Sequence, residues 1–231
     1  MILKPFDKLP EKFQNEEVKV YYDILYKKRF SLMLKRVMDF VLALLLTIVL
    51  LIPMLVIALC IKCSSKGPVL YKQQRVTKYG KVFKIWKFRS MTVGADKMGA
   101  LVTSQNDSRI TGIGKILRKF RLDELPQVFH VLSGKMSIVG TRPEVQKYVD
   151  RYSDKMYATL LTPAGITSLA SIKYKDEDEI IGEISDVSQV DDVYVNTILP
   201  EKMKYNLEYI EDFSFIKDIA LMFKTVIEVI K

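Results

Sequence analysis

Two adjacent carboxylates, Asp123 and Glu124, follow a long stretch of basic sequence. From Lys62 to Arg121 the chain holds fifteen Lys or Arg residues and only two acids. Neighbouring carboxylates are a natural ligand set for Mg²⁺, which binds one or two of them together with substrate phosphate oxygens. The metal and the surrounding cations would mask the charge of an Asp nucleophile that approaches an anionic phosphorus. These residues predict chemistry on a phosphorylated substrate.

The same carboxylates also have an ordinary structural explanation. If Asp123 caps a helix, Pro126 falls in the first turn, where its missing N–H has no consequence, and Glu124 is an exposed first-turn residue. A helix N-terminus also carries about half a positive charge and free N–H groups, which favour a phosphate beside the carboxylates. The residues alone leave both interpretations open.

Composition limits the other chemistry. The chain has a single His, His130, so acid–base steps fall to carboxylates or Lys. Cys60 and Cys63 form a Cys-x-x-Cys pair, but a zinc site needs two further ligands, so we interpret both as small apolar side chains at a membrane interface. The net charge of +9 is uneven, because residues 176–192 hold eight acids and no base. A basic patch suits nucleic acid, anionic lipid or nucleotide phosphates, and the adjacent apolar run favours membrane and phosphate ligands over nucleic acid.

The apolar run from Phe40 to Ile61 has 22 residues without a charge. As a helix it would be about 33 Å long, enough to span a bilayer. A polar segment precedes it and no small-residue cleavage pattern follows, so we do not expect a cleavable signal. Basic residues flank both ends of the run. The preference of basic residues for the cytoplasmic side would be satisfied if both ends lay on that face. Pro53 removes one helical hydrogen bond, so a helix broken there and re-entering the same face is as good an interpretation as a kinked spanning helix.

The elements that must position the carboxylates form a mixed α/β fold, mostly helical, with a small domain docked against the membrane. At 231 residues the chain can hold one ordinary domain and a membrane element. Alternation, turn signals and helical spacing predict strands at 68–71, 81–87 and 136–139, and helices at 113–120, 125–132, 144–161 and within 201–231. A basic, aromatic helix at 18–30 would lie on the membrane surface or pack on the domain. We predict an interfacial segment at 1–36, a membrane helix at 37–62, a catalytic domain at 63–200 and C-terminal amphipathic helices at 201–231.

Five motifs in a fixed order behind the apolar run resemble the bacterial sugar transferase family, the monotopic polyprenyl-phosphate phosphoglycosyl transferases. The resemblance covers about residues 31–167, and more loosely the C-terminal helices. The motifs are Lys81-Val-Phe-Lys-Ile-Trp-Lys-Phe-Arg-Ser-Met91, Asp107-Ser-Arg-Ile-Thr111, Ile113-Gly114, Leu117-Arg-Lys-Phe-Arg-Leu-Asp-Glu-Leu-Pro-Gln127 and Met136-Ser-Ile-Val-Gly-Thr-Arg-Pro143.

This resemblance implies a reaction and a location. Family members move a sugar 1-phosphate from a nucleotide diphosphate sugar, usually a UDP-sugar, onto undecaprenyl phosphate, and the products are a lipid diphosphate sugar and UMP. It implies an enzyme of the bacterial inner membrane, with its catalytic domain on the cytoplasmic face, that begins assembly of a cell-surface glycan. Membrane lipid is then a partner and nucleic acid is not. The oligomeric state is left open, with a homodimer as one option.

The resemblance also assigns roles to residues. Asp123 would be the nucleophile that forms a covalent phospho-sugar intermediate, and Glu124 would help to place Mg²⁺ and the substrate. An Arg can donate bidentate hydrogen bonds to two phosphate oxygens. Each of these cations can equally be a surface residue without a functional role. In the family the apolar run is a re-entrant helix broken at a proline, which Pro53 matches. The implied phosphate ligands are Arg75, Lys87, Arg89, Arg118 and Arg142.

The sequence departs from the family pattern at several places. Ile52 stands where a small polar residue often precedes the proline, and Thr141 replaces a common Pro. A Trp-containing segment ending in Asn-Gly-Arg is absent after Pro163, so the donor sugar is open, and Lys173 or Lys175 is a candidate substitute for the missing Arg. Two other functions compete: a non-catalytic module that holds anionic lipid, and a glycosyltransferase that releases UDP.

Overall fold

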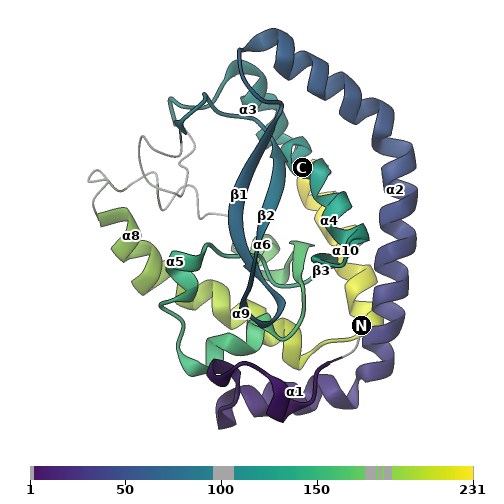
Figure 1. Cartoon of the computed structure of the whole chain (residues 1–231), viewed down its shortest axis with the longest axis vertical. Coiled ribbons are helices and arrows are strands. Elements are labelled where there is room, and N and C mark those ends of the chain that lie inside the picture. The colour runs from purple at the N-terminus through teal and green to yellow at the C-terminus, as the bar shows by residue number, and fades with distance from the viewer. Residues whose placement is uncertain (1–2, 96–106, 175–180, 182–183, 185–188, 231) are drawn as a thin grey trace.

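The computed structural model describes residues 3–95, 107–174, 181, 184 and 189–230. In this part of the chain the fold is mostly helical, with two small two-stranded sheets, which confirms the predicted mixed α/β class. A long hairpin stands at the centre, one long helix runs along its side, and shorter helices fill the space between and below them (Figure 1).

Helix α2, Arg29–Ser64, contains the apolar run. Within the described ranges it is the one helix long and apolar enough to cross a membrane, and only 11% of its most apolar 18-residue window is buried, unlike a core helix. The expected interruption at Pro53 is not seen, because the helix is continuous there. Figure 1 shows α2 rising along the domain and bending over its top. A proline removes a single helical hydrogen bond, which a bend can accommodate. The predicted segments 1–36 and 37–62 thus share this helix.

The N-terminal helix packs on the domain. Two short 3₁₀ turns, Phe6–Lys8 and Glu11–Phe13, lead into α1, Glu16–Lys27. The side chain of Asn15 caps α1 by accepting the N–H of Val18 at 2.8 Å. Its apolar face is buried in the main core, which favours packing on the domain over lying on the membrane surface; the buried residues are Val18, Tyr21, Tyr22 and Leu25.

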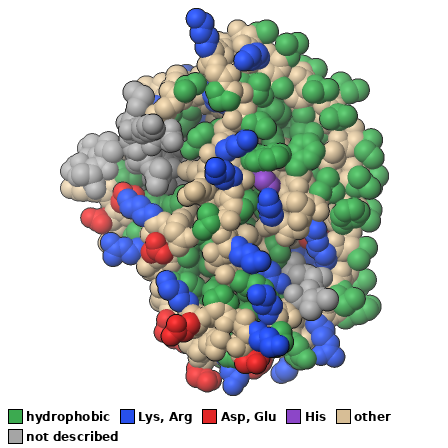
Figure 2. All heavy atoms as spheres, viewed as in Figure 1, with side chains coloured by type: hydrophobic (Ala, Val, Ile, Leu, Met, Phe, Trp, Pro, Cys, Tyr) green, Lys and Arg blue, Asp and Glu red, His purple; other side chains and the backbone are tan. Residues whose placement is uncertain are grey.

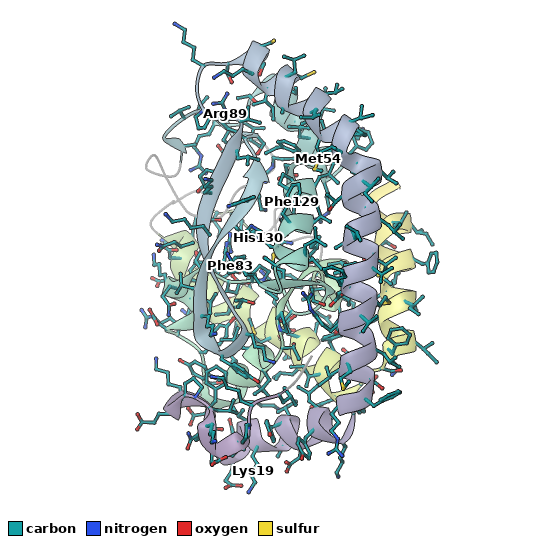
Figure 3. The ribbon with its side chains drawn as sticks, turned by 45° about the vertical axis from the view of Figure 1, so that its right-hand side comes forward. Lys19, Met54, Phe83, Arg89, Phe129 and His130 are labelled. Carbon is teal, nitrogen blue, oxygen red and sulfur yellow. The ribbon has the colours of Figure 1, made fainter. Side chains whose placement is uncertain are left out.

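The predicted hairpin is confirmed and is longer than expected. Strands β1, Leu70–Thr77, and β2, Lys81–Phe88, pair antiparallel around the turn Lys78–Gly80. Alternation along β2 turns Phe83 and Ile85 into a core shared with α2 and α4 (Figure 3). The opposite face of the hairpin carries Lys and Arg, whereas hydrophobic side chains cover the edge formed by α2 (Figure 2).

The segment after the hairpin follows the predictions only in part. Helix α3, Gly112–Lys119, and strand β3, Met136–Val139, are confirmed. The expected helix at 125–132 is a 3₁₀ segment, Leu122–Gln127, followed by the short α4, Val128–Leu132. The single helix predicted at 144–161 is wrong: α5, Gln146–Val149, and a 3₁₀ segment, Asp154–Leu160, replace it, because tyrosines on both sides of the interruption turn into the core. Strand β4, Ala164–Thr167, pairs parallel with β3 and was not predicted.

The C-terminal region is helical, as predicted. Helix α6, Leu169–Lys173, precedes the acidic stretch, most of which lies outside the described residues. The elements that follow are α8, Val190–Val193, a π turn, Tyr194–Ile198, α9, Leu199–Glu211, and α10, Phe215–Ile230. Helix α10 lies beside α2 (Figures 1 and 3).

Buried charges join α2, α10 and β3. The Nζ of Lys35 lies 2.7 Å from Oδ2 of Asp218, and both side chains are at most 1% exposed. Asp39 accepts hydrogen bonds from the Ser137 hydroxyl at 2.7 Å and from the Ile138 N–H at 3.0 Å. Helix α2 is therefore fixed to the domain by polar contacts as well as by apolar packing.

Candidate active site

A cavity of about 550 Å³ lies against the hairpin, where residues of β1 and β2 line it. We call it the polar cavity. Asp123 lines it, and so does every cation that the sequence suggested as a phosphate ligand: Arg75, Lys87, Arg89, Arg118 and Arg142. These residues come from both strands of the hairpin, from α3, from the 3₁₀ segment 122–127 and from the turn after β3. The structure thus brings together residues that are far apart in the sequence.

The carboxylates are positioned by a tight connection between α3 and the following 3₁₀ segment. Thr111 caps α3 by accepting the N–H of Gly114 at 3.0 Å. A Cβ on Gly114 would lie 1.9 Å from the Ser90 carbonyl oxygen, so α3 packs against the end of β2 with no room for a side chain. Arg121 has a left-handed φ of 51°, unusual for a residue with a side chain, and turns the chain into the segment that carries Asp123.

The explanation of Asp123 as a helix cap and Glu124 as an exposed residue is wrong. Arg121 occupies the cap position, and Asp123 and Glu124 lie inside the 3₁₀ segment. The two side chains are 7% and 9% exposed, because the segment packs against β2. Buried charges are costly unless they are paired, so their partners matter.

Glu124 is held by two cations. Its Oε1 lies 2.7 Å from the Nζ of Lys87 and 3.3 Å from Nη2 of Arg142. Burial alone would raise the pKa of Glu124, but the charges of Lys87 and Arg142 outweigh burial and hold the pKa below its usual value. Glu124 is therefore ionised and fixes the positions of the Lys87 and Arg142 side chains.

Asp123 differs from its neighbour. Burial raises the pKa of Asp123 above its usual value, although the charge of Lys87 acts against this effect, the charge of Glu124 adds to it, and Arg118 again opposes it. A buried carboxylate with a raised pKa is a stronger base, and a better nucleophile, than one in water. The pair thus has one carboxylate tightly held by cations and one that faces the polar cavity.

Arg142 is positioned by the β3–β4 pair. Gly140 and Gly165 let the two strands approach closely, since a Cβ on Gly165 would lie 2.2 Å from the Gly140 nitrogen. The Thr141 hydroxyl donates a hydrogen bond to the Thr159 carbonyl at 2.9 Å and so ties the turn to the core.

Of the other three arginines, two hold the backbone around the cavity. Arg75 donates from Nη1 to the Pro143 carbonyl at 3.1 Å and from Nη2 to Gln73 at 2.8 Å. Arg89 is 5% exposed and donates to the carbonyl of Ser65 at 2.8 Å, so it fixes the end of α2 to β2 (Figure 3). Arg118, in the last turn of α3, is half-buried at the cavity wall.

The wall of the polar cavity contains a buried polar cluster that was not predicted from the sequence. Glu144 accepts a hydrogen bond from the Tyr194 hydroxyl at 3.0 Å and lies 3.1 Å from the Nζ of Lys202. Tyr148 stacks on Tyr194 with ring centroids 4.2 Å apart. The one available signal was the place of Glu144 directly after the Arg-Pro turn, since Tyr194 and Lys202 come from a region without a motif.

Several other candidates lie away from the cavity. Lys173 pairs with Glu208 at 2.7 Å on the surface, and Lys175 lies outside the described residues. Cys60 and Cys63 are free and exposed. The Nε2 of His130 accepts a hydrogen bond from the backbone N–H of Trp86 at 3.0 Å. Burial lowers the pKa of His130 to about 4, so His130 is a neutral structural residue. In the described ranges no three His, Cys, Asp or Glu side chains cluster as a metal site.

The match to known proteins agrees with the motifs. The model of the family described as Bacterial sugar transferase matches residues 30–231. The chain belongs to the bacterial sugar transferase family.

Three curated relatives show how far the similarity extends. The chain is 38% identical over 198 residues to a UDP-N-acetylgalactosamine-undecaprenyl-phosphate N-acetylgalactosaminephosphotransferase from Aeromonas hydrophila, which covers 84% of this chain and 43% of that protein. It is 35% identical over 200 residues to a UDP-glucose:undecaprenyl-phosphate glucose-1-phosphate transferase from Klebsiella pneumoniae, over 85% of this chain and 40% of that protein. It is 42% identical over 126 residues to a putative undecaprenyl-phosphate N-acetylgalactosaminyl 1-phosphate transferase from Bacillus subtilis, over 54% of this chain and 70% of that protein. The chain thus spans less than half the length of the first two relatives.

Proposed function

We propose that this protein transfers a sugar 1-phosphate from a UDP-sugar to undecaprenyl phosphate and releases UMP. The proposal depends on one observation: two adjacent carboxylates in one buried segment have different surroundings. Asp123 faces the polar cavity, whereas Glu124 lies 2.7 Å from Lys87 and 3.3 Å from Arg142. The relatives named above act on undecaprenyl phosphate, with donors that differ among them. The donor sugar is therefore not part of the proposal.

The reaction proceeds in two displacements at one phosphorus. First, a carboxylate oxygen of Asp123 bonds to the phosphorus that carries the sugar, and the bond from that phosphorus to the bridging oxygen breaks, so UMP leaves with the electron pair. Second, a phosphate oxygen of undecaprenyl phosphate bonds to the same phosphorus, and the bond to Asp123 breaks, which restores the carboxylate. Lys87, Arg118 and Arg142 stabilise the negative charge that develops on the phosphoryl oxygens.

Magnesium is part of the proposal. The donor set fits Mg²⁺ because Asp123 faces the cavity and Glu124 adjoins it, and Mg²⁺ is held by one or two carboxylates plus phosphate oxygens and water. The cation would neutralise charge on the substrate diphosphate.

The membrane part of the proposal is a re-entrant α2 at the cytoplasmic face of the inner membrane. Basic residues at both ends of the apolar run, the bend of α2 and its exposed apolar side chains support it. The test is cysteine labelling at both chain ends in intact cells, after Cys60 and Cys63 are replaced by Ser. We expect both ends to be protected from reagents that cannot cross the membrane. Labelling of one end from outside would overturn the re-entrant path.

The test of the reaction is UMP release across a panel of UDP-sugars with Mg²⁺ and undecaprenyl phosphate. Asp123→Asn should abolish release, and the unsubstituted protein given donor alone should gain the mass of a sugar phosphate on Asp123. Asp150→Asn is the matched control, because Asp150 is exposed and away from the cavity. Release of UDP would indicate an ordinary glycosyltransferase. Membrane binding without turnover would indicate a lipid-binding module.

A further inference from the structure

A second cavity, also of about 550 Å³, lies on the other side of the carboxylate pair. We call it the apolar groove. Leu46 and Leu50 of α2 form one wall and Val226 of α10 another, and Ile166 of β4 and Ile172 of α6 also line it. Its lining is much richer in hydrocarbon than that of the polar cavity, which has a row of arginines.

The hydroxyl groups in the lining are occupied within the protein. The hydroxyls of Thr167 and Thr225 lie 2.5 Å apart, and Ser171 lies 2.8 Å from Ser168. Hydroxyls that already have partners give little to a base, a ribose or a sugar, each of which needs hydrogen bonds when it is buried. The groove therefore suits an apolar chain better than a nucleotide or a sugar.

The charged residues of the groove are Glu228, Glu124 of the carboxylate pair and two arginines near that pair. Arg121, Glu124 and Arg142 line the groove, and Arg142 also lines the polar cavity. Asp123 lines the polar cavity, whereas Glu124 lines the groove. An anion at this end of an apolar occupant would meet two arginines and would lie next to the proposed nucleophile.

The groove opens between apolar surfaces. Leu46 is 43% exposed and Val226 is 57% exposed, on helices that lie side by side at the apolar edge of the molecule (Figures 2 and 3). Exposed apolar surface of this kind favours contact with lipid hydrocarbon. A chain dissolved in the bilayer could thus enter between α2 and α10 without crossing water.

We propose that the apolar groove binds the isoprenoid units next to the phosphate of the acceptor lipid, a role that rests on the proposed function. The acceptor phosphate then reaches Arg121 and Arg142 from the groove, while the donor occupies the polar cavity. The two substrates approach Asp123 from different sides, so UMP can leave without crossing the path of the lipid. The groove is of ordinary ligand-site size and holds only the first few units, and the rest of the chain stays in the bilayer.

Neighbouring residues on α10 provide a matched test. Val226 lines the groove and Ile227 does not, and the two are 57% and 54% exposed, so Trp should be tolerated at either position. In Val226→Trp, the mass adduct on Asp123 should form from the donor at the normal rate. The concentration of undecaprenyl phosphate needed to discharge that adduct should rise about tenfold or more, because the ring fills the groove. Ile227→Trp should behave like the unsubstituted protein.

A second pair of variants, at Leu50 and Leu51 of α2, shows whether an effect at Val226 comes only from a local folding defect in α10. Leu50 lines the groove, whereas Leu51 is 49% exposed and does not. Leu50→Trp should weaken discharge and Leu51→Trp should not, with binding to vesicles of phosphatidylglycerol unchanged in both. Equal behaviour within each pair, or slower adduct formation that matches the slower discharge, would overturn the proposal. A parallel loss of vesicle binding would assign the groove to ordinary membrane lipid and would also overturn it.

Failure of the proposed function has a different signature. If no adduct forms in the unsubstituted protein, the covalent reaction is contradicted. The groove is then tested without chemistry, by binding of fluorescent polyprenyl phosphate to Asp123→Asn protein. Adding Val226→Trp should weaken that binding about tenfold, and adding Ile227→Trp should leave it unchanged. Equal binding by the two would contradict the groove itself.

Discussion

The Nζ of Lys87 lies 2.7 Å from Oε1 of Glu124, and this contact joins the hairpin to the 3₁₀ segment that carries the carboxylates. It has two effects. It keeps a buried glutamate ionised, and it fixes a cation next to Asp123, whose pKa that same cation lowers against the effect of burial. One lysine thus couples the states of both carboxylates.

Lys87→Met should lower kcat/KM by roughly 10- to 100-fold, the effect of removing one charge-assisted phosphate contact. It should also change the pH profile. The pKa of Glu124 is held low by Lys87 and Arg142, so without Lys87 burial raises it and the acidic limb of activity moves to higher pH. The measurement is UMP release from pH 5 to pH 8. Lys84→Met, an exposed lysine of the same strand, should keep the normal profile, and an unmoved limb in Lys87→Met would contradict the coupling.

Gly114→Ala should reduce the free energy of unfolding by about 2 kcal/mol or more. Its Cβ would meet the Ser90 carbonyl at 1.9 Å, so α3 must move away from β2 and carry Asp123 with it. Gly112→Ala is the control, since nothing lies within 4 Å of a Cβ there, and it should stabilise α3 by about 0.5–1 kcal/mol. Urea unfolding in detergent micelles measures both. Similar values for the two variants would show that α3 is not held closely.

Lys35→Met should reduce stability by about 3–5 kcal/mol, because it leaves the buried carboxylate of Asp218 without its cation. The double variant Lys35→Met with Asp218→Asn should recover part of this loss, since no unpaired charge then remains at that pair. A double-mutant cycle on the unfolding free energies gives the coupling directly. Additive losses would show that the two side chains do not depend on each other.

Acid should weaken the fold through His130. Burial lowers its pKa to about 4 in the folded state, against about 6.5 in the unfolded chain, so the unfolded chain binds the proton first as pH falls. The contribution of His130 is complete above pH 6.5 and is lost progressively toward pH 4, by up to about 3 kcal/mol. His130→Gln can still accept the Trp86 N–H and does not titrate, so its unfolding free energy should fall less between pH 7 and pH 5. Equal slopes for the two proteins would contradict this account.

Much of the site could be predicted because its residues lie in short motifs with local signals. The turn at Tyr79-Gly80 identified the hairpin, and helical spacing identified α3. Family motifs identified the cations that the fold gathers around Asp123. What local patterns could not give is which cation reaches which carboxylate, because Lys87 and Glu124 meet only when β2 packs on the 3₁₀ segment.

The missed elements depend on contacts between distant segments. Strand β4 has only four residues and contains Gly165, so its β character comes from pairing with β3 and not from its own sequence. An interruption was expected at Pro53, because a sequence shows the lost hydrogen bond but not the packing that keeps the neighbouring turns of α2 intact. The burial of Glu144 with Lys202 likewise requires the C-terminal helices in place.

The ion pair between Lys35 and Asp218 also constrains how the molecule is made. Lys35 precedes the apolar run and leaves the ribosome well before Asp218, which belongs to α10. At about 5–20 residues per second the interval between them is roughly ten to forty seconds. During translation the charge of Lys35 on α2 therefore has no partner in Asp218 until α10 has been synthesised. Docking of α2 onto the domain is therefore completed only once α10 has been made.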